Sequence, residues 1–246
     1  PKWKGLGSIY FSFASKLATI FFDEIITDSF EMNKIYRNRF NKHSTIIAYG
    51  STMTNYNGIK FLNKFKLKQK NYYLIIGRLI PDNNAKLIIE GFLESSSKKK
   101  LVIIGDVPYS DNYVKKIKSF SAENVIFTGY INNQTELTCL YKNCYAYIHG
   151  HEFGGTNPTM INALFLNCQI IALNTVFNKE MLKNKIALFF EKNKQSIKQT
   201  INSLESKYNK ITDYNKKYNL PSIYDWDYIS IKYIELFLKI TNYQSK

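Results

Sequence analysis

The sequence predicts an α/β protein built on a parallel sheet with helices on both faces. Short apolar runs, rich in Ile, Val, Leu and Tyr, alternate along the chain with longer amphipathic stretches. The runs are continuously apolar, which is typical of strands buried on both faces. Strands that alternate with helices form right-handed βαβ units, and such units build a parallel sheet. Hydrophobic residues make up 45% of the 246-residue chain, which is enough for a sizeable core and argues against disorder.

The first part of the chain predicts a short series of elements. A helix is expected first, followed by a strand over 24–28, a helix over 29–40 and a strand over 45–50. Residues 51–70 are polar, contain Asn, Gly and Lys, and show weak periodicity. We therefore interpret residues 51–70 as a connector.

From residue 72 the alternation becomes regular. The predicted strands are apolar runs that end at turn-forming residues, namely 72–77, 101–105, 125–129, 145–149, 169–173 and, as a candidate, 186–190. The predicted helices lie between these runs, at 84–94, 112–120, 135–141 and 158–166. From residue 195 the chain is expected to be helical, and it ends in an amphipathic helix over 227–240.

The net charge of the chain narrows the class of partner. Lys and Arg number 34 against 19 Asp and Glu, and the net charge of +15 favours an anionic partner such as phosphate, nucleic acid or an acidic membrane surface.

The three cysteines are too few and too unevenly spaced for a secreted disulfide framework, so we expect buried thiols in a reducing compartment. No apolar run approaches the ~20 residues that cross a bilayer. The start, Pro1-Lys2-Trp3-Lys4, lacks Met and a signal-peptide layout, so we expect either a piece of a longer chain or a chain whose beginning was removed.

The segment 149–164 is the strongest functional signal. It follows a predicted strand and opens a predicted helix, with Asn157 as a suitable N-cap and Pro158 at the first helical position. Gly154 and Gly155 remove side chains just before that N-terminus. Bare amides at the positive end of a helix dipole form an anion site, although a tight strand-to-helix turn explains the same residues equally well.

A second signal follows the predicted strand 72–77. Arg78 comes directly after this strand, and the carboxyl ends of parallel strands meet at one edge of a sheet, where ligands bind. A guanidinium there can bind a diphosphate in bidentate fashion. Taken alone, an arginine in a loop is more often an ordinary surface residue.

Joined together, these segments resemble family 4 of the GT-B glycosyltransferases, which are retaining enzymes that use nucleotide-sugar donors. The resemblance is colinear, covers most of the chain and is carried by residues 77–79, 101–106, 125–129, 149–164 and 224–226. A closer similarity is to a subgroup often described as rhamnosyltransferases. Its His-Gly-His-x-x-Gly-Gly-Thr-Asn-Pro and Pro-Glu-Asn-Asn signatures match residues 149–158 and, with Asp for Glu, 81–84.

The resemblance implies Rossmann-like domains. Residues 51–226 would form the C-terminal, nucleotide-sugar-binding domain of a GT-B enzyme, and residues 1–50 a partial remnant of the N-terminal, acceptor-side domain. Residues 227–246 would form the C-terminal crossover helix. The isolated chain is then expected to have little or no transferase activity, and robust sugar transfer in a radiolabelled-donor assay would contradict this.

The resemblance also implies roles for individual residues. Arg78 and the backbone at Gly155 would stabilise the departing diphosphate in a front-face substitution, and Glu152 is a candidate for contact with the donor sugar. The residues implied in donor binding are Gly77, Arg78, Asn83, Tyr130, Ile131, His151, Gly154, Gly155, Thr156, Asn157 and Asn162.

Three positions depart from the family pattern. Asn162 stands where the family has a glutamate that holds the ribose hydroxyls, and the loss of charge should weaken that contact. Gly154 stands where the family has its first motif glutamate. Asn83 stands where the family commonly has a phosphate-binding lysine, although the subgroup signature also has Asn there.

We expect no metal or other cofactor. His149 and His151 flank one loop, but the cysteines are not spaced for zinc. Residues 225–227 resemble the metal-binding Asp-x-Asp of another glycosyltransferase class, yet they precede a helix and are better interpreted as its N-cap.

The function expected from the resemblance is transfer of a sugar, with rhamnose as the candidate, from a nucleotide-diphosphate sugar to a glycan precursor of the bacterial cell surface. The acceptor would be a glycan or a lipid-linked one, and the location cytoplasmic or peripheral at the acidic inner face of the membrane. No recognition motif for nucleic acid accompanies the basic charge. The alternative is a catalytically impaired or truncated GT-B remnant that binds nucleotide or serves as a scaffold.

Overall fold

The structure is a computed structural model, in which the chain folds into two compact units. The structure describes residues 5–51, 53, 56–107, 112–120, 122–183, 187–215 and 222–244, with the backbone alone at 207–215 and 242–244. Unit 1 comprises residues 1–51, 154–158 and 221–246. Unit 2 comprises residues 52–153 and 159–220.

Unit 2 is built on a six-stranded parallel sheet in the order β5-β4-β3-β6-β7-β8. Its strands are β3 (Tyr72–Ile76), β4 (Lys100–Ile104), β5 (Val125–Gly129), β6 (Ala146–His149), β7 (Ile170–Leu173) and β8 (Ala187–Phe190). The predicted α/β class and parallel sheet are confirmed, and the candidate strand at 186–190 is present as β8. Most of these strand residues are buried, as expected for strands covered on both faces.

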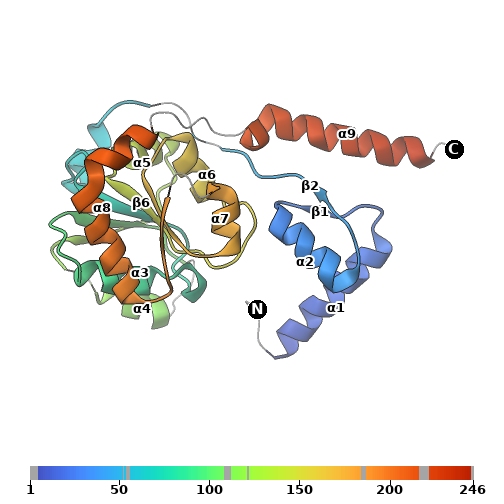
Figure 1. Cartoon of the computed structure of the whole chain (residues 1–246), viewed down its shortest axis with the longest axis horizontal. Helices are drawn as coiled ribbons and strands as arrows, with labels where there is room; N and C mark the ends of the chain where they lie inside the picture. The colour runs from blue at the N-terminus through green and yellow to red at the C-terminus, as the bar shows by residue number, and fades with distance from the viewer. Residues whose placement is uncertain are drawn as a thin grey trace. The chain divides into compact units, whose positions relative to one another are not determined.

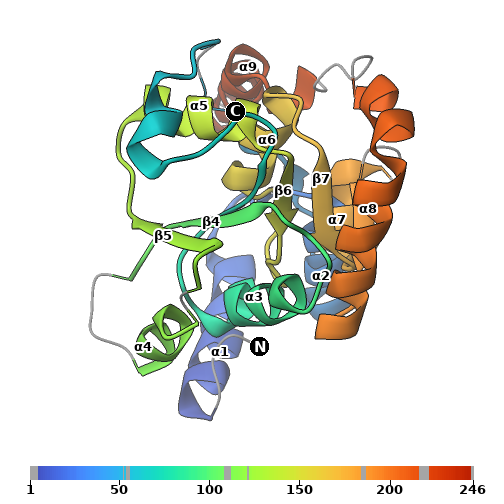
Figure 2. The same ribbon diagram turned by 90° about the vertical axis from the view of Figure 1, so that its left-hand side faces the viewer.

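Helices cover both faces of this sheet, and Figure 2 shows α3 on one face and α5 and α6 on the other. The helical elements are η1 (Lys60–Phe65), η2 (Pro81–Asn83), α3 (Ala85–Leu93), α4 (Asn112–Lys118), α5 (Gln134–Asn143), α6 (Pro158–Phe165), α7 (Val176–Leu182) and α8 (Lys194–Asn215). On the α3 face, Tyr73 and Ile75 of β3 pack with Ile88 of α3 and Ile197 of α8 in one apolar core. Alternate strand residues therefore serve two separate helix layers.

Three helical elements were not predicted, namely η1, η2 and α7. The 3-10 helix η1 lies inside the expected connector, and α7 is a short, mostly polar helix after β7. Helix α7 begins at Thr175, whose side chain accepts a hydrogen bond from the Asn178 amide at 3.1 Å. A helix of this length is stabilised by its cap and its tertiary contacts, so it leaves little periodicity in the sequence.

Unit 1 contains α1 (Leu6–Phe21), β1 (Ile26–Thr27), α2 (Phe30–Phe40), β2 (Thr45–Ile46), η3 (Ser222–Tyr224) and α9 (Trp226–Gln244), all labelled in Figure 1 except η3. The predicted strands over 24–28 and 45–50 are wrong in length, because β1 and β2 have two residues each. The two strands pair only with each other within the described residues, so no neighbouring strand extends the ladder. A small core of Ile47, Ile229 and Leu236 joins α9 to the chain after β2.

Two expectations about individual side chains are confirmed. The Asp225 carboxylate accepts hydrogen bonds from the amides of Asp227 (2.9 Å) and Tyr228 (3.4 Å), which is N-capping of α9. The cysteines are free and buried, and these are Cys139, Cys144 and Cys168.

Candidate functional site

The functional edge of unit 2 lies where the strand order reverses. The chain runs outward from β3 through β4 to β5 and then returns to place β6 on the other side of β3. In an open parallel sheet, the carboxyl ends of the two strands at such a reversal flank a crevice that binds ligands. Here those ends carry Gly77 and Arg78 after β3, and Gly150 and His151 after β6. These residues line one small cavity together with Asn83.

Arg78 offers a free guanidinium at this edge. Its side chain is exposed and makes no ion pair with any residue that the structure describes. The loop that carries it is held by two hydrogen bonds, from the Gly77 amide to the Ile104 carbonyl (3.0 Å) and from Asn83 Nδ2 to the Arg78 carbonyl (2.8 Å). Asn83 was implied as a donor contact, but in this structure its amide nitrogen supports the Arg78 loop.

The loop after β6 is held from two directions. Asn84 Nδ2 donates to the Gly150 carbonyl (2.9 Å) and to Glu152 Oε1 (2.8 Å). On the other side, Asn178 Nδ2 of α7 donates to the His151 carbonyl at 3.2 Å. The signature at 81–84 and the histidine loop are therefore two halves of one arrangement, in which side-chain amides satisfy loop carbonyls.

The Glu152 carboxylate binds two side chains of unit 2. Besides the bond from Asn84, its carboxylate pairs with Lys192 at 2.5 Å, and its side chain is mostly buried. The contact with a donor sugar that sequence analysis gave as a candidate role stays a prediction. This carboxylate also stabilises the fold, because its ion pair with Lys192 links the loop after β6 to the segment after β8.

The two histidines of this loop are neutral. Burial lowers the pKa of His149 well below its usual value of 6.5, and the adjacent His151 acts in the same direction. Burial, followed by the charge of Arg78, lowers the pKa of His151 to about 4. Both imidazoles are therefore uncharged at pH 7, and the positive charge beside them is that of Arg78.

The glycine-rich turn belongs to unit 1 and contacts a carboxylate there. The Thr156 amide donates to Asp28 Oδ2 at 3.0 Å, and Thr156 Oγ1 accepts from the Tyr49 amide at 3.1 Å. A Cβ placed on Gly155 would lie 1.8 Å from Asp28 Oδ1, so only glycine fits there. An amide that the resemblance assigns to donor phosphate thus already binds an anionic group in this structure.

The other implied donor-binding residues have varied surroundings. Tyr130 is 78% exposed, whereas Ile131, next in the chain, is 7% exposed. Asn162 lies on α6 and is 8% exposed. Gly154 has φ +120° and open space around it, so it permits a sharp turn of the loop. Asn157 directly precedes α6.

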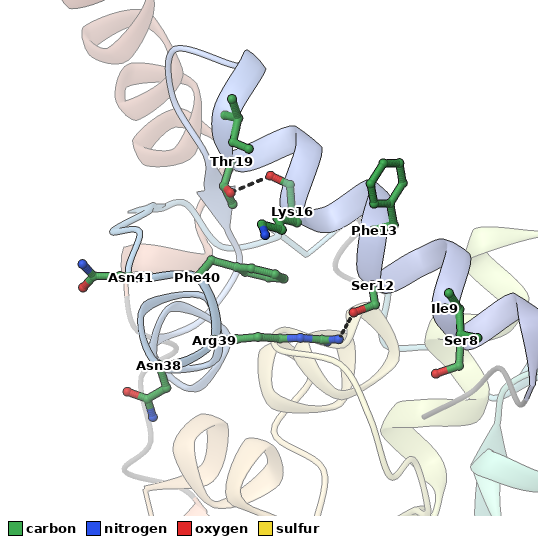
Figure 3. Close-up of a pocket in the computed structure, with 11 residues that line it drawn as sticks. Ser8, Ile9, Ser12, Phe13, Lys16, Thr19, Asn38, Arg39, Phe40 and Asn41 are labelled. Atoms are coloured by element: carbon green, nitrogen blue, oxygen red, sulfur yellow. Dashed lines mark hydrogen bonds between the residues drawn. The ribbon is translucent and has the colours of Figure 1, made fainter.

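A larger pocket, of about 850 Å³, lies in unit 1 between α1 and α2 (Figure 3). Its wall combines apolar side chains such as Ile9 and Phe13 with two cations, Lys16 and Arg39. The Arg39 guanidinium donates a hydrogen bond to Ser12 Oγ, as the dashed line in Figure 3 shows. None of the α1 residues is buried. This pocket brings together no pair of acid and base groups, so it is a weaker candidate for chemistry than the edge of the sheet.

The described parts of the chain hold neither a metal-binding cluster nor a membrane-spanning helix. No group of three or more His, Cys, Asp or Glu side chains there could hold a metal ion. None of the described helices combines the length and apolarity needed to cross a bilayer.

Comparison with known proteins identifies the class. The sequence model of the family described as "Glycosyl transferases group 1" matches residues 59–219, which is more than half of the chain. The chain therefore belongs to this family, as the resemblance of its motifs implied.

Individual relatives agree with this class. The chain is 28% identical over 115 residues to the N-acetylgalactosamine-N,N'-diacetylbacillosaminyl-diphospho-undecaprenol 4-alpha-N-acetylgalactosaminyltransferase of Campylobacter jejuni, a match that covers 46% of this chain and 30% of that protein. The structure is similar to Anabaena Alr3699/HepE in complex with UDP-glucose, with a TM-score of 0.77, 14% identity and coverage of 91% of this chain and 66% of that one. It is also similar to sucrose-phosphate synthase of Thermosynechococcus elongatus, with a TM-score of 0.79, 13% identity and coverage of 98% and 65%. These structures support the GT-B fold, and the chain spans about two thirds of their length.

Part of this edge was not predicted from the sequence. Tyr147 Oη lies 2.9 Å from His149 Nδ1, which lies 3.3 Å from His151 Nδ1, and neither Tyr147 nor His149 was predicted as a site residue. Residues at i, i+2 and i+4 of a strand point to the same face, so the spacing of 147, 149 and 151 was the available signal.

Proposed function

We propose that the chain is the donor-binding portion of a retaining glycosyltransferase that takes its sugar from a nucleoside-diphosphate sugar. The observation that carries the proposal is the exposed guanidinium of Arg78 at the reversal point of the sheet, between the ends of β3 and β6, which forms no ion pair with a described residue. A guanidinium binds a diphosphate through two parallel hydrogen bonds and retains its charge at all relevant pH values. The family membership supports this assignment of the ligand.

The chemistry asked of these residues is electrostatic. As the bond between the sugar and the diphosphate breaks, negative charge grows on the departing oxygens. Arg78 would stabilise that charge, and its loop is already held in place by Asn83. In a front-face substitution the departing phosphate itself guides the acceptor, so no protein base is required on this part of the chain.

The acceptor we propose is a lipid-linked glycan precursor at the cytoplasmic face of an acidic membrane. The name of the Campylobacter relative includes a diphospho-undecaprenol acceptor. The net charge of +15 favours approach to an acidic surface. The candidate donor sugars are rhamnose, which the subgroup signature implies, and N-acetylgalactosamine, which appears in the name of that relative.

Replacing Arg78 by alanine should abolish most of the affinity for a nucleoside diphosphate. Charge-assisted hydrogen bonds contribute about 1.5–3 kcal/mol, so we expect binding of UDP to weaken by about 10- to 100-fold. Isothermal titration calorimetry on the whole chain measures this, with dTDP run in parallel to compare the bases. Arg37→Ala is the matched control, because it removes the same charge from an exposed position on α2 of unit 1. Equal affinities of the wild type and Arg78→Ala would contradict the proposal.

A scaffold function is the second candidate. It is favoured by Asn162 and Gly154, which stand where the family has carboxylates that hold the donor. The same calorimetry separates the two candidates. If neither UDP nor dTDP binds the wild-type chain, the donor-binding function is excluded and the scaffold function is the candidate that is left.

A further inference from the structure

A line of hydrogen bonds runs from α6 to His151 through the end of β6. Tyr147 Oη lies 2.8 Å from Thr159 Oγ1 and 2.9 Å from His149 Nδ1. His149 Nδ1 lies 3.3 Å from His151 Nδ1, and the two imidazole rings stack with centroids 4.4 Å apart. The side chains of Tyr147 and His149 are buried, so their protons have few alternative hydrogen-bond acceptors.

The surroundings of His149 Nε2 indicate which ring nitrogen of His149 carries the proton. His149 Nε2 is buried and has no hydrogen-bond partner in the described structure. A buried N–H without an acceptor is rarer and more costly than a bare acceptor, so we assign the proton to Nδ1. His149 Nδ1–H then donates to Tyr147 Oη, and the Tyr147 hydroxyl donates onward to Thr159 Oγ1.

This assignment fixes the tautomer of His151 in turn. Its Nδ1 lies 3.3 Å from His149 Nδ1, whose one proton is directed mainly at Tyr147 Oη at 2.9 Å and has His151 Nδ1 as a second, weaker acceptor. His151 Nδ1 is therefore the unprotonated nitrogen, and its own proton lies on Nε2. The Nε2 side of this ring lies against Gly77, where an added Cβ would be 3.0 Å from Cε1 and Nε2. No described residue pairs with His151 Nε2, and the ring lines the same cavity as Arg78.

We propose that His151 presents a neutral Nε2–H to a phosphate oxygen of the nucleotide sugar, and that His149 and Tyr147 are positioning residues that hold it in this tautomer. This inference rests on the proposed function, because the phosphate is that of the donor. Arg78 supplies the charge and His151 an uncharged, directional donor beside it. The lowered pKa of His151 agrees with a ring that stays neutral next to a guanidinium. The absence of a side chain at Gly77 leaves room for the ring at this position.

The tautomers can be measured without any ligand. Long-range ¹H–¹⁵N correlation spectra of the ¹⁵N-histidine-labelled chain at pH 7 should show His149 protonated on Nδ1 and His151 on Nε2. In Tyr147→Phe, His149 loses its acceptor, and its Nδ1–H signal should shift or exchange faster. A His151 ring protonated on Nδ1, or on both nitrogens, would overturn the inference.

Binding of UDP tests the contact with phosphate. We expect His151→Ala to weaken binding by about 10-fold, and Tyr147→Phe by about 3-fold through the lost positioning. His151→Gln should lie within about 3-fold of the wild type, since its amide keeps a neutral N–H donor of similar reach. Tyr72→Phe is the matched control. Its buried hydroxyl bonds the Leu140 carbonyl at 2.6 Å at the opposite end of β3, and its loss should leave binding unchanged.

The outcomes separate this inference from the proposed function. If the wild type binds UDP and His151→Ala binds it equally well, the inference is overturned and the donor site of Arg78 stands. If the wild type binds no nucleoside diphosphate, the proposed function fails and the phosphate contact of His151 fails with it. A loss of binding in Tyr72→Phe as large as that in Tyr147→Phe would assign the effect to general destabilisation and overturn the positioning role.

Discussion

Lowering the pH from 7.5 to 5 is expected to destabilise unit 2 by about 2 kcal/mol through His151 alone. The pKa of this ring is about 4 in the folded chain against a usual value of 6.5. Near pH 5 the unfolded chain therefore binds a proton that the folded chain does not. The free energy of unfolding falls as pH falls through 6.5 and levels off near 4. His149, whose pKa is also lowered, adds a loss of the same sign.

Denaturant unfolding at the two pH values measures this loss. Trp226 belongs to unit 1, so its fluorescence does not report on unit 2, and the transition should be followed by far-UV circular dichroism. In His151→Asn the pH-dependent loss should shrink by about 2 kcal/mol, because the group that takes up the proton is gone. His43→Gln, at an exposed position of unit 1, should leave the loss intact. A wild-type stability that is flat between pH 7.5 and 5 would show that these rings are not buried in their neutral form.

The sheet of unit 2 could be predicted because its strands are continuous apolar runs. Residues 72–76 and 101–104 show no polar alternation, and both are buried on two faces in the structure. The predicted strands at 24–28 and 45–50 were too long for a different reason. Composition reports which residues favour an extended chain, but the length of a ladder depends on which strand lies alongside, and β1 has only β2 within the described residues.

The edge of the sheet was partly predictable. Arg78 and the histidine loop both follow strands, and the rule for parallel sheets places such residues at one edge, as the structure does. The resemblance could not show which side chains bind ligand and which hold the loops. Asn83 and Asn84 donate to the carbonyls of Arg78 and Gly150, and only the spatial register of the two loops reveals those partners.

Replacing Gly105 by alanine is expected to destabilise unit 2 by about 3 kcal/mol or more. Gly105 follows β4 with φ +131°, a conformation that side chains disfavour. A Cβ there would also lie 2.0 Å from the Gly77 carbonyl oxygen, so backbone would have to move. The shift would reach the loop that carries Arg78, because the Gly77 amide bonds the Ile104 carbonyl next to Gly105.

A second glycine separates the two causes of this loss. Gly129 ends β5 with φ +71°, but a Cβ there would meet nothing within 4 Å. Gly129→Ala should therefore cost only the left-handed backbone conformation, about 1 kcal/mol, and leave UDP affinity unchanged. Gly105→Ala should lower both the unfolding midpoint and the affinity. Equal losses of stability in the two variants would mean that the close approach of Gly105 to Gly77 contributes nothing to the stability of unit 2.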